Sequence, residues 1–411
     1  MKVLYRLKDA GHQAFLVGGG VRDLLLGRRP KDFDIATDAR PEQVRALFSN
    51  SRLIGRRFRL AHIRFGREII EVATFRGTTP ASAGDGDDTQ VFHASGRIIA
   101  DNVYGTIEED AWRRDFTINA LYYNIADYSI WAFADGLTDL KSRQLRLIGD
   151  PARRYTEDPV RMLRAARFAA KLGFTLHPDS AAPIPEMASL LDDVPPARLF
   201  DEFLKMFQSG HALQSYRCLR ELGLFHHLFP DTGYWLDDPE NNADAQLIEQ
   251  ALENTDKRIA EDKSVTPMFL FGAFLWRAVR ERTEQIKNES ADFSAMEALI
   301  EATVEISMRQ AQRIALPRRF GFPMREMLQL QPRFDTRRGR RAMNLLSHRR
   351  FRAAYDLMLL RVSVGEVDQE VADFWTNIQE QSAEEQRDTL GLSGRRRRSA
   401  KKRRPESGSP S

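Results

Sequence analysis

The sequence predicts two styles of structure in one chain, an α/β-type region at the N-terminus and an all-helical remainder. Residues 1–149 alternate short β-rich runs with helical patterns. From about residue 156 the strand signals disappear, and apolar residues recur at helical spacing. The chain has 411 residues, of which 42% are apolar. It is therefore long enough to bury real cores in about two to four domains.

The first region carries the strand signals. We expect a strand at 14–17, a break at the three glycines 18–20, and a helix at 21–26. Further elements follow along the chain: a strand at 33–36, a helix at 41–48 with proline in its first turn, and a hairpin of strands 60–65 and 69–75 with its turn at Gly66-Arg67. Residues 77–97 are rich in Gly, Ser, Thr and Asp, so we expect a mobile loop there.

The remainder is predicted to be helical. The run TEDP at 156–159 has the composition of a helix start, with a capping threonine, early acids and proline in the first turn. Further helices are expected at 197–208, 212–222, 245–260, 266–281, 294–313 and 349–364. Residues 382–411 have low hydrophobicity and end in Arg, Lys, Ser and Pro, so we expect disorder.

Composition excludes several classes of protein. Cys218 is the single cysteine, which rules out a disulfide framework and fits a reducing compartment. The start lacks the pattern of a signal peptide, and the longest strongly apolar stretch, Met268 to Trp276, is too short to span a bilayer. We therefore expect a soluble, cytoplasmic protein with no membrane span.

The net charge of +4 is unevenly distributed. Residues 395–404 read RRRRSAKKRR and contribute eight positive charges, so the rest of the chain carries about −4. Such a block usually stays disordered and binds polyanions. The residues that we expect to make these contacts are Arg395, Arg396, Arg397, Arg398, Lys401, Lys402, Arg403 and Arg404.

The strongest local signal for chemistry is GGGVRD at 18–23, followed by GRRPKDFD at 27–34. Glycines after a strand let the backbone approach a triphosphate closely. Asp32 and Asp34 are two apart on a predicted strand, so their side chains share a face and can hold a pair of Mg²⁺ ions. Asp-x-Asp alone would also fit a solvated strand end, and Arg22 would also fit a helix-surface charge.

A third carboxylate is predicted at Glu71. The segment EIIEVATF at 68–75 is apolar on both faces, and a charge in a doubly buried strand is costly unless it is paired or metal-bound. Glu71 is therefore a candidate metal ligand, with an ion pair to an arginine as the alternative.

Two later motifs combine arginines with acids. RRDFTINAL at 113–121 offers Arg114 for phosphate or ribose contacts, with Asp115 either a further catalytic carboxylate or a residue that orients the arginines. An amphipathic helix with a charged end is the alternative. In EDPVR at 157–161, Asp158 and Arg161 share a helical face, as do Arg161 and Arg164. They could read a base edge or form a surface ladder of ion pairs.

Together these motifs resemble the class II nucleotidyltransferases, the family of bacterial tRNA CCA-adding enzymes and poly(A) polymerases. The joint match spans residues 14–174 in the family order. The matching pieces are GGGVRDLLLGRRPKDFDIAT (18–37), EIIEVATFR (68–76), RRDFTINALYY (113–123) and EDPVRMLRAARFAAKLGF (157–174).

Within that family the chain is more similar to the poly(A) polymerase branch. The segment from Ile54 to His62, the stretch from Phe351 to Leu357 and the basic tail carry this likeness. The sequence has no adjacent His-Asp pair, which argues against the phosphohydrolase domain of some CCA-adding relatives. One departure is that the poly(A) branch usually has additional residues before its first strand, so either the true start lies upstream or this lead-in is dispensable.

The resemblance implies an α+β nucleotidyltransferase head, a small mixed sheet with helices, followed by all-α neck, body and tail domains. We place the head at 1–149, the neck at 150–210, the body and tail at 211–381 and the disordered basic tail at 382–411. It implies ATP as substrate and two Mg²⁺ ions, held by Asp32, Asp34 and a third carboxylate, either Glu71 or Asp115.

The resemblance also implies roles for the remaining residues. Asp158 and Arg161 would select the base, and the triphosphate ligands would be Gly19, Gly20 and Arg22, with Arg114 and Arg164 as helpers. The partners would be the 3′ ends of mRNA, small regulatory RNA and, as a further candidate, tRNA, with RNA-decay proteins recruited by the tail. The alternatives are a CCA-adding enzyme and a non-catalytic RNA-binding protein on the same fold.

Overall fold

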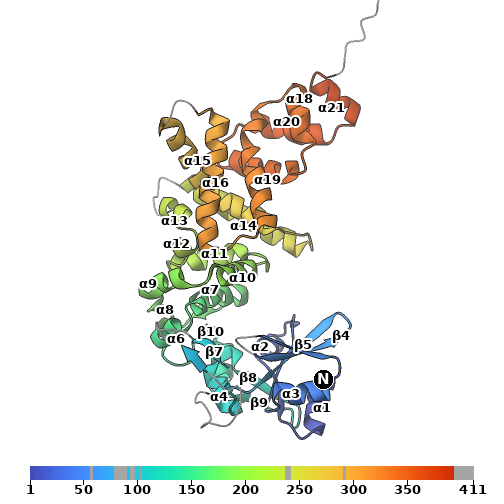
Figure 1. The fold of residues 1–411 in the computed structure, drawn as a ribbon, viewed down its shortest axis with the longest axis vertical. Helices are drawn as coiled ribbons and strands as arrows, with labels where there is room; N and C mark the ends of the chain where they lie inside the picture. Colours follow the sequence, from blue (N-terminus) through green and yellow to red (C-terminus); the bar gives the residue numbers. More distant parts are fainter. Residues whose placement is uncertain are drawn as a thin grey trace, which may run out of the picture. The chain divides into compact units, whose positions relative to one another are not determined.

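The computed structural model describes residues 1–55, 59–77, 90–92, 98–101, 103–236, 242–289 and 293–392 (Figure 1). The chain divides into two compact units. Unit 1 comprises Met1–Asp238, Leu252–Val265 and Met308–Leu316, and unit 2 comprises the remaining segments. Unit 1 holds the predicted head, the predicted neck and part of the predicted body at 211–381, so the two units do not follow the four parts expected from the sequence.

A mixed sheet organises the first part of unit 1. Within the described residues its seven strands have the order β3-β4-β5-β2-β1-β8-β9. β2 and β5 are parallel, and the other neighbours are antiparallel. The strands are β1 (Ala14–Val17), β2 (Asp34–Thr37), β3 (Ser51–Ile54), β4 (Leu60–Phe65), β5 (Glu68–Thr74), β8 (Leu121–Asn124) and β9 (Ile130–Ala132). The expected small mixed sheet is confirmed.

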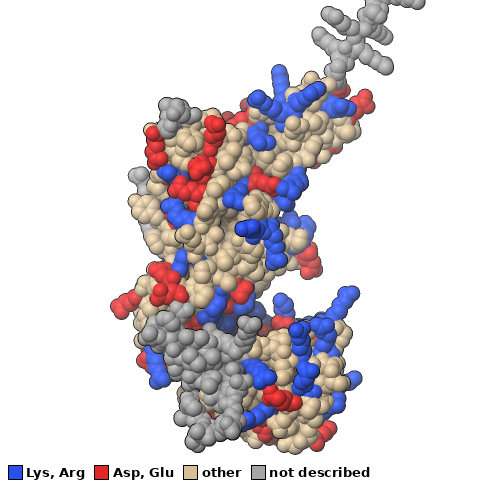
Figure 2. All heavy atoms as spheres, in the orientation of Figure 1, with Lys and Arg blue, Asp and Glu red and all other residues tan. Residues whose placement is uncertain are grey.

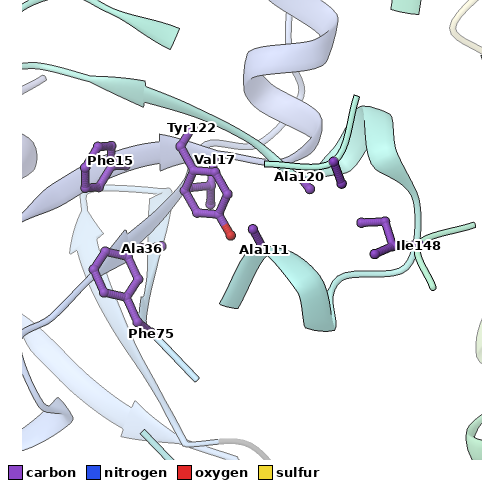
Figure 3. Close-up of a cluster of buried hydrophobic side chains, with 9 residues drawn as sticks. Phe15, Val17, Ala36, Phe75, Ala111, Ala120, Tyr122 and Ile148 are labelled. Carbon is purple, nitrogen blue, oxygen red and sulfur yellow. The ribbon is translucent and has the colours of Figure 1, made fainter. Parts of the chain in front are cut away.

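The central strand β1 buries side chains on both faces of the sheet. Phe15 and Val17 of β1 point to one face and pack with Phe75, Tyr122 and Ala111 (Figure 3). The intervening Leu16 is buried on the opposite face, as the period of two in a strand requires. The helices of this region are α1 (Lys2–Asp9), α2 (Gly19–Leu25), α3 (Pro41–Leu47), α4 (Ile107–Arg113) and α5 (Gly136–Ser142).

The rest of unit 1 is helical apart from a two-stranded parallel pair, β10 (Gln144–Leu145) with β11 (Thr175–Leu176). Helix α7 packs against α10 and α11. The helices here are α6 (Pro151–Glu157), α7 (Val160–Leu172), α8 (Pro178–Ala181), α9 (Ile184–Met187), α10 (Pro196–Phe207), α11 (Ala212–Glu221), α12 (Phe225–Leu228) and α13 (Pro230–Leu236). Aromatic side chains such as Phe203 and Phe229 fill the core between them.

Unit 2 is built from helices throughout its described residues. α15 and α17 approach so closely that a Cβ atom on Gly272 would lie 2.1 Å from Met327 Cε. The helices are α15 (Pro267–Glu289), α17 (Arg318–Gln329), α18 (Gly339–Leu346), α19 (Phe351–Ser363), α20 (Gln369–Gln379) and α21 (Ala383–Thr389), while α14 (Asn242–Ala260) and α16 (Ala295–Arg313) run through both units.

The structure corrects several expected boundaries. Thr156 lies in the last turn of α6 and bonds the carbonyl of Ala152, so it caps no helix; Asp158 and Pro159 separate α6 from α7. Residues 383–389, expected to be disordered, form α21 with a capping box at Ser382. Part of the expected loop 77–97 is strand, since β6 (Gln90–Phe92) pairs with β7 (Ile98–Asp101). No helix of the described residues is long and apolar enough to cross a membrane.

Candidate active site

The glycine-rich turn brings the first aspartate and an arginine together. Gly18 has a φ of +67°, and a Cβ atom there would lie 3.4 Å from Arg114 Nη1. A Cβ atom on Gly20 would lie 3.4 Å from the carbonyl oxygen of Asp32. The positive φ favours glycine at position 18, and a Cβ atom at either position would only just fit against its neighbour. The turn carries the predicted triphosphate ligands Gly19 and Gly20 beside the carboxylate segment.

Arg22 is buried, with 2% of its surface exposed, so the alternative of a helix-surface charge is wrong. Its Nη1 donates to Asn119 Oδ1 at 2.6 Å, and its Nε and Nη2 donate to Asp23. The guanidinium also lies over the ring of Phe168, 5.3 Å from its centroid. Arg22 therefore joins α2 to the RRD segment and to α7, and its contact with a triphosphate stays a prediction.

The parallel pairing of β2 and β5 sets Asp34 directly beside Glu71. Burial raises the pKa of Asp34, and the nearby carboxylates of Glu71 and Asp32 raise it further, against the opposing effect of Arg114. Ionised carboxylates in this position repel one another, so a bound cation would relieve the repulsion. In the described residues, however, no three His, Cys, Asp or Glu side chains converge closely enough to form a ready ligand set.

The strand that carries Glu71 is less buried than expected. Glu68, Ile69 and Glu71 are exposed, so the inference from a doubly buried strand was wrong, although the side chain remains beside Asp34. The partner of Glu71 is a histidine rather than an arginine: His62 Nε2 lies 3.0 Å from Glu71 Oε1, across the β4–β5 pair. The sequence offered no signal for this contact, because it depends on strand register.

A cavity of about 500 Å³ lies where the sheet meets α6, α7 and α10. Its lining holds eight cationic and five acidic side chains. Burial, with the neighbouring Arg76 and Arg154, lowers the pKa of Arg113 to about 10. Burial and Arg161 lower the pKa of Arg154 to about 10 as well. The surplus of crowded cations makes the cavity suited to a polyanion such as a triphosphate.

Arg114 is fixed in this cavity by two residues that the sequence analysis did not single out. Its guanidinium contacts Asp110 at 3.0 Å and the hydroxyl of Tyr122 at 2.8 Å, and Tyr122 donates to Asp110 at 2.6 Å. Burial opposes the charge of Arg114, but the carboxylate of Asp110 raises its pKa above the ordinary value. Asp110 is four residues away on α4, a spacing that could have signalled the pair.

Asp115 forms an ion pair with a residue of α7. Arg164 of α7 donates to its Oδ2 through Nε at 2.8 Å, and Asn119 and the backbone N–H of Phe116 donate to Oδ1 at 3.1 and 2.8 Å. Burial opposes ionisation, yet the Arg164 guanidinium holds the pKa of Asp115 well below its usual range. These contacts match the predicted orienting role, so we propose Glu71 rather than Asp115 as the third carboxylate.

The predicted base-reading residues both line the cavity, but different partners hold them. Asp158 Oδ2 accepts from Arg198 of α10 at 3.0 Å. Arg161 Nη1 donates to the carbonyl of Arg154 at 2.7 Å and contacts Glu157 at 3.2 Å. The expectation that Asp158 and Arg161 share a helical face was wrong, because Asp158 has extended backbone angles just after α6 and only Arg161 and Arg164 lie in α7. The predicted tail residues 395–404 lie outside the described residues.

Three family models match the chain in succession. The poly A polymerase head domain matches residues 14–146, and the probable RNA and SrmB-binding site of polymerase A matches residues 173–236. The polymerase A arginine-rich C-terminus matches residues 291–408. The first match agrees with the extent of the mixed sheet and its helices.

Relatives and solved structures extend these matches. Poly(A) polymerase I of Salmonella typhi is 47% identical, covering 98% of this chain and 88% of that protein. A CCA-adding enzyme of Lactobacillus helveticus is 38% identical, covering only 53% of this chain and 51% of that enzyme. An apo form of a CCA-adding enzyme has a TM-score of 0.60 at 20% identity, covering 92% of this chain and 82% of that one, which is a likeness of fold.

Proposed function

We propose, starting from the fact that the chain belongs to the poly(A) polymerase I family of nucleotidyltransferases, that it adds AMP from ATP to RNA 3′ ends without a template. The RNA 3′-hydroxyl oxygen would attack the α-phosphorus of ATP. The bond from that phosphorus to the β-bridging oxygen would break, and pyrophosphate would leave.

The observation that carries this proposal is that the cation-lined cavity reaches β5, the strand that carries Glu71 beside Asp34. The triphosphate would lie near Gly19 and Gly20, with Arg114 as a ligand already fixed by Asp110 and Tyr122. Fixed donors need no reorganisation when charge develops on the phosphate oxygens. Arg164 would act mainly by holding Asp115.

The carboxylate set fits Mg²⁺ in its chemistry. Hard oxygen donors suit this ion, and the raised pKa of Asp34 reports a position where negative charge lacks full compensation. Asp32, Asp34 and Glu71 would hold two ions, which when bound would supply activation of the RNA hydroxyl and neutralisation of the leaving pyrophosphate.

RNA binding is proposed for the basic surfaces. In unit 2, exposed arginines lie in and just before α18: Arg337, Arg338, Arg340 and Arg341. Figure 2 shows basic side chains gathered in this part of the unit. Together with the tail at 395–404 they would contact phosphates independently of sequence. This suits mRNA, small regulatory RNA and tRNA ends, and a role in RNA processing and decay. Contacts with RNA-decay proteins through the tail are part of the proposal.

The test is nucleotide addition to a generic RNA and to a tRNA lacking its 3′ end, with each nucleotide supplied separately and the products sized. We expect long adenylate tails on both RNAs and strong preference for ATP over CTP. Three additions confined to tRNA, with CTP used first, would identify a CCA-adding enzyme instead. Absence of any product would favour a non-catalytic RNA-binding protein.

A further inference from the structure

A solvent-exposed phenylalanine lies on α17 of unit 2, on the side of the helix that faces away from the core. Phe322 is 54% exposed, although it is a large apolar residue. The buried side of α17 consists of Pro323, Met324, Met327 and Leu328. This side faces α15, where Gly272 lies against the same methionines. The exposed part of the Phe322 ring therefore takes no part in the packing of α17.

Three arginines stand on the same face of α17 as Phe322. Arg318 and Arg319 precede it by four and three residues, and Arg325 follows it by three, so helical geometry places all three beside the ring. Arg318 and Arg319 are exposed, and Arg325 is half-buried. Among the residues that the structure describes, none of the three forms an ion pair. Their positive charges are thus not neutralised by the chain itself.

The acidic residue beside them is already paired. Within α17 the only acid is Glu326, which accepts hydrogen bonds from Arg349 and from Arg350, the second at 3.0 Å. Five guanidinium groups therefore stand against one carboxylate, a net charge of +4. The group is called the α17 surface below and comprises Arg318, Arg319, Phe322, Arg325, Glu326, Arg349 and Arg350.

One side of the Phe322 ring is held by its neighbour. The guanidinium carbon of Arg325 lies 4.7 Å from the ring centroid, which is a cation–π contact. Because more than half of Phe322 is exposed, the ring keeps surface for a second planar group. A group stacked there would lie among the unpaired arginines of the same face.

These features favour one class of ligand. A single exposed apolar side chain is common and implies no ligand. An exposed ring among unpaired arginines, however, is typical of surfaces that bind single-stranded nucleic acid, since bases stack on the ring and phosphates contact the cations. A duplex keeps its bases stacked on one another, so it could use the arginines but not the ring. A lipid surface would need the apolar side of the helix, which is buried against α15.

We propose that the α17 surface is a binding site for single-stranded RNA, in which a base stacks on the exposed side of the Phe322 ring and phosphates contact the adjoining arginines. This inference rests on the proposed function, because the ligand is the RNA whose 3′ end is extended. The site differs in kind from the arginines at α18, a helix that exposes no large apolar side chain and so offers contacts to phosphates only.

The first experiment measures the affinity of the full chain for an oligoadenylate, as a single strand and paired with its complement. Phe322→Ala should weaken binding of the single strand by about tenfold, the scale of one base stacked on an aromatic ring. Phe322→Tyr, which keeps the ring, should bind as the wild type does. Binding of the duplex should be the same in all three proteins, and an equal loss with the duplex would overturn the stacking role.

The dependence of affinity on salt separates the ring from the arginines. Arg318→Ala should reduce the magnitude of the slope of log K against log salt by about 0.7 for each lost phosphate contact with a single strand. Phe322→Ala should leave the slope unchanged, because stacking releases no counterions. A slope that falls in Phe322→Ala would overturn the inference, since it would trace the loss of affinity to displaced arginines.

Ile300→Ala is the matched control. Ile300 is also exposed in unit 2, at 42%, but its neighbours on α16 are the acids Glu297 and Glu301 instead of arginines. The variant removes exposed apolar surface at a site that repels phosphates, so its affinity for the single strand should equal that of the wild type. A loss equal to that of Phe322→Ala would overturn the inference, because exposed apolar surface anywhere on the unit would then suffice.

Phe322→Trp supplies a signal from the site itself. A base stacked on the new indole should quench its fluorescence, so the single strand should quench this variant more than the wild type, and the duplex should not. Equal quenching of the two proteins, or an unchanged affinity in Phe322→Ala, would overturn the inference and leave the α17 surface to a protein partner. AMP addition by the wild type is measured separately: its absence would overturn the proposed function, whereas the quenching alone decides whether RNA stacks at Phe322.

Discussion

The carboxylates on the two sides of the candidate active site have opposite electrostatic surroundings. On the sheet, Asp34 lies beside Glu71 and its pKa is raised, so carboxylates gather with incomplete compensation. On the side that faces α7, Asp115 is paired with Arg164 and its pKa is lowered. This difference supports the proposal that the sheet side takes up a cation from solution. The side that faces α7 is held by the chain's own ion pairs before any ligand arrives.

The largest expected loss of activity comes from a substitution on the sheet side. Asp34→Asn should reduce AMP addition by about 10³-fold or more, since metal-assisted stabilisation of phosphoryl transfer supplies several kcal/mol. The fold should survive, because Asp34 has a raised pKa. Its ionisation, as the pH rises above the ordinary value of 3.8, lowers the free energy of unfolding.

Thermal unfolding measures this effect of Asp34 ionisation on stability. Above about pH 5, where an ordinary carboxyl is ionised, Asp34→Asn should unfold at an equal or higher temperature than the wild type without divalent cation. Mg²⁺ should then stabilise the wild type more than the variant. Near wild-type turnover at saturating Mg²⁺, or equal stabilisation by Mg²⁺, would contradict the metal assignment.

The next largest effect is a loss of stability from a substitution in the ion pair of Asp115 with Arg164. Asp115→Ala leaves the Arg164 guanidinium without its carboxylate, and removing one partner of a largely buried pair typically costs about 3–5 kcal/mol in the free energy of unfolding. Denaturant unfolding checks this. The double variant Asp115→Ala with Arg164→Met should recover most of the loss, because no unpaired charge remains.

Acid titration tests the same ion pair. Ionisation of Asp115 stabilises the fold, whereas ionisation of Asp34 destabilises it. The lowered pKa of Asp115 gives stability that is present above its unfolded pKa and is lost as the pH falls towards the folded value. Asp115→Asn should therefore lose less stability than the wild type below about pH 4. Parallel curves for the two proteins would show that the pair contributes nothing to folding.

A smaller effect concerns reading of the base. Arg161→Ala should cost about 1–3 kcal/mol of discrimination against GTP and UTP, the usual value of a good base contact. The AMP rate itself should fall less. Single-nucleotide addition with each of the four nucleotides measures the change, and an equal loss of rate with all four would show that Arg161 serves structure or phosphate instead.

The smallest effect on chemistry is expected from the basic tail. Deleting residues after Gly394 should leave addition of a single AMP unchanged while it weakens RNA binding and flattens its dependence on salt. The slope of log K against log salt is negative, and each lost phosphate contact with a single strand reduces its magnitude by about 0.7. Affinity measured across salt concentrations tests this, and an unchanged slope would assign the tail to a protein partner.

Much of this protein could be predicted from the sequence because the signals were local. The strands at 14–17 and 60–65 depend on spacing within a few residues, and the structure places them as expected. The glycine break and the shared strand of Asp32 and Asp34 were only partly right, because α2 already begins at Gly19 and β2 begins at Asp34, so Asp32 lies outside the strand. The resemblance to class II nucleotidyltransferases agrees with the family models and relatives. The burial of Arg22 and the helix at 383–389 were missed, because both depend on packing with distant segments or on a cap within a polar run.

The sequence by itself determined the chemical inventory: which carboxylates, arginines and glycines are present, and in which turns and strands they stand. Only the tertiary structure decided their partners. Glu71 meets Asp34 and His62 through strand register, and Asp158 meets Arg198 across 40 residues. The physical reason is that the strength and direction of an ionic contact depend on distance and burial in space, and neither is encoded by position along the chain.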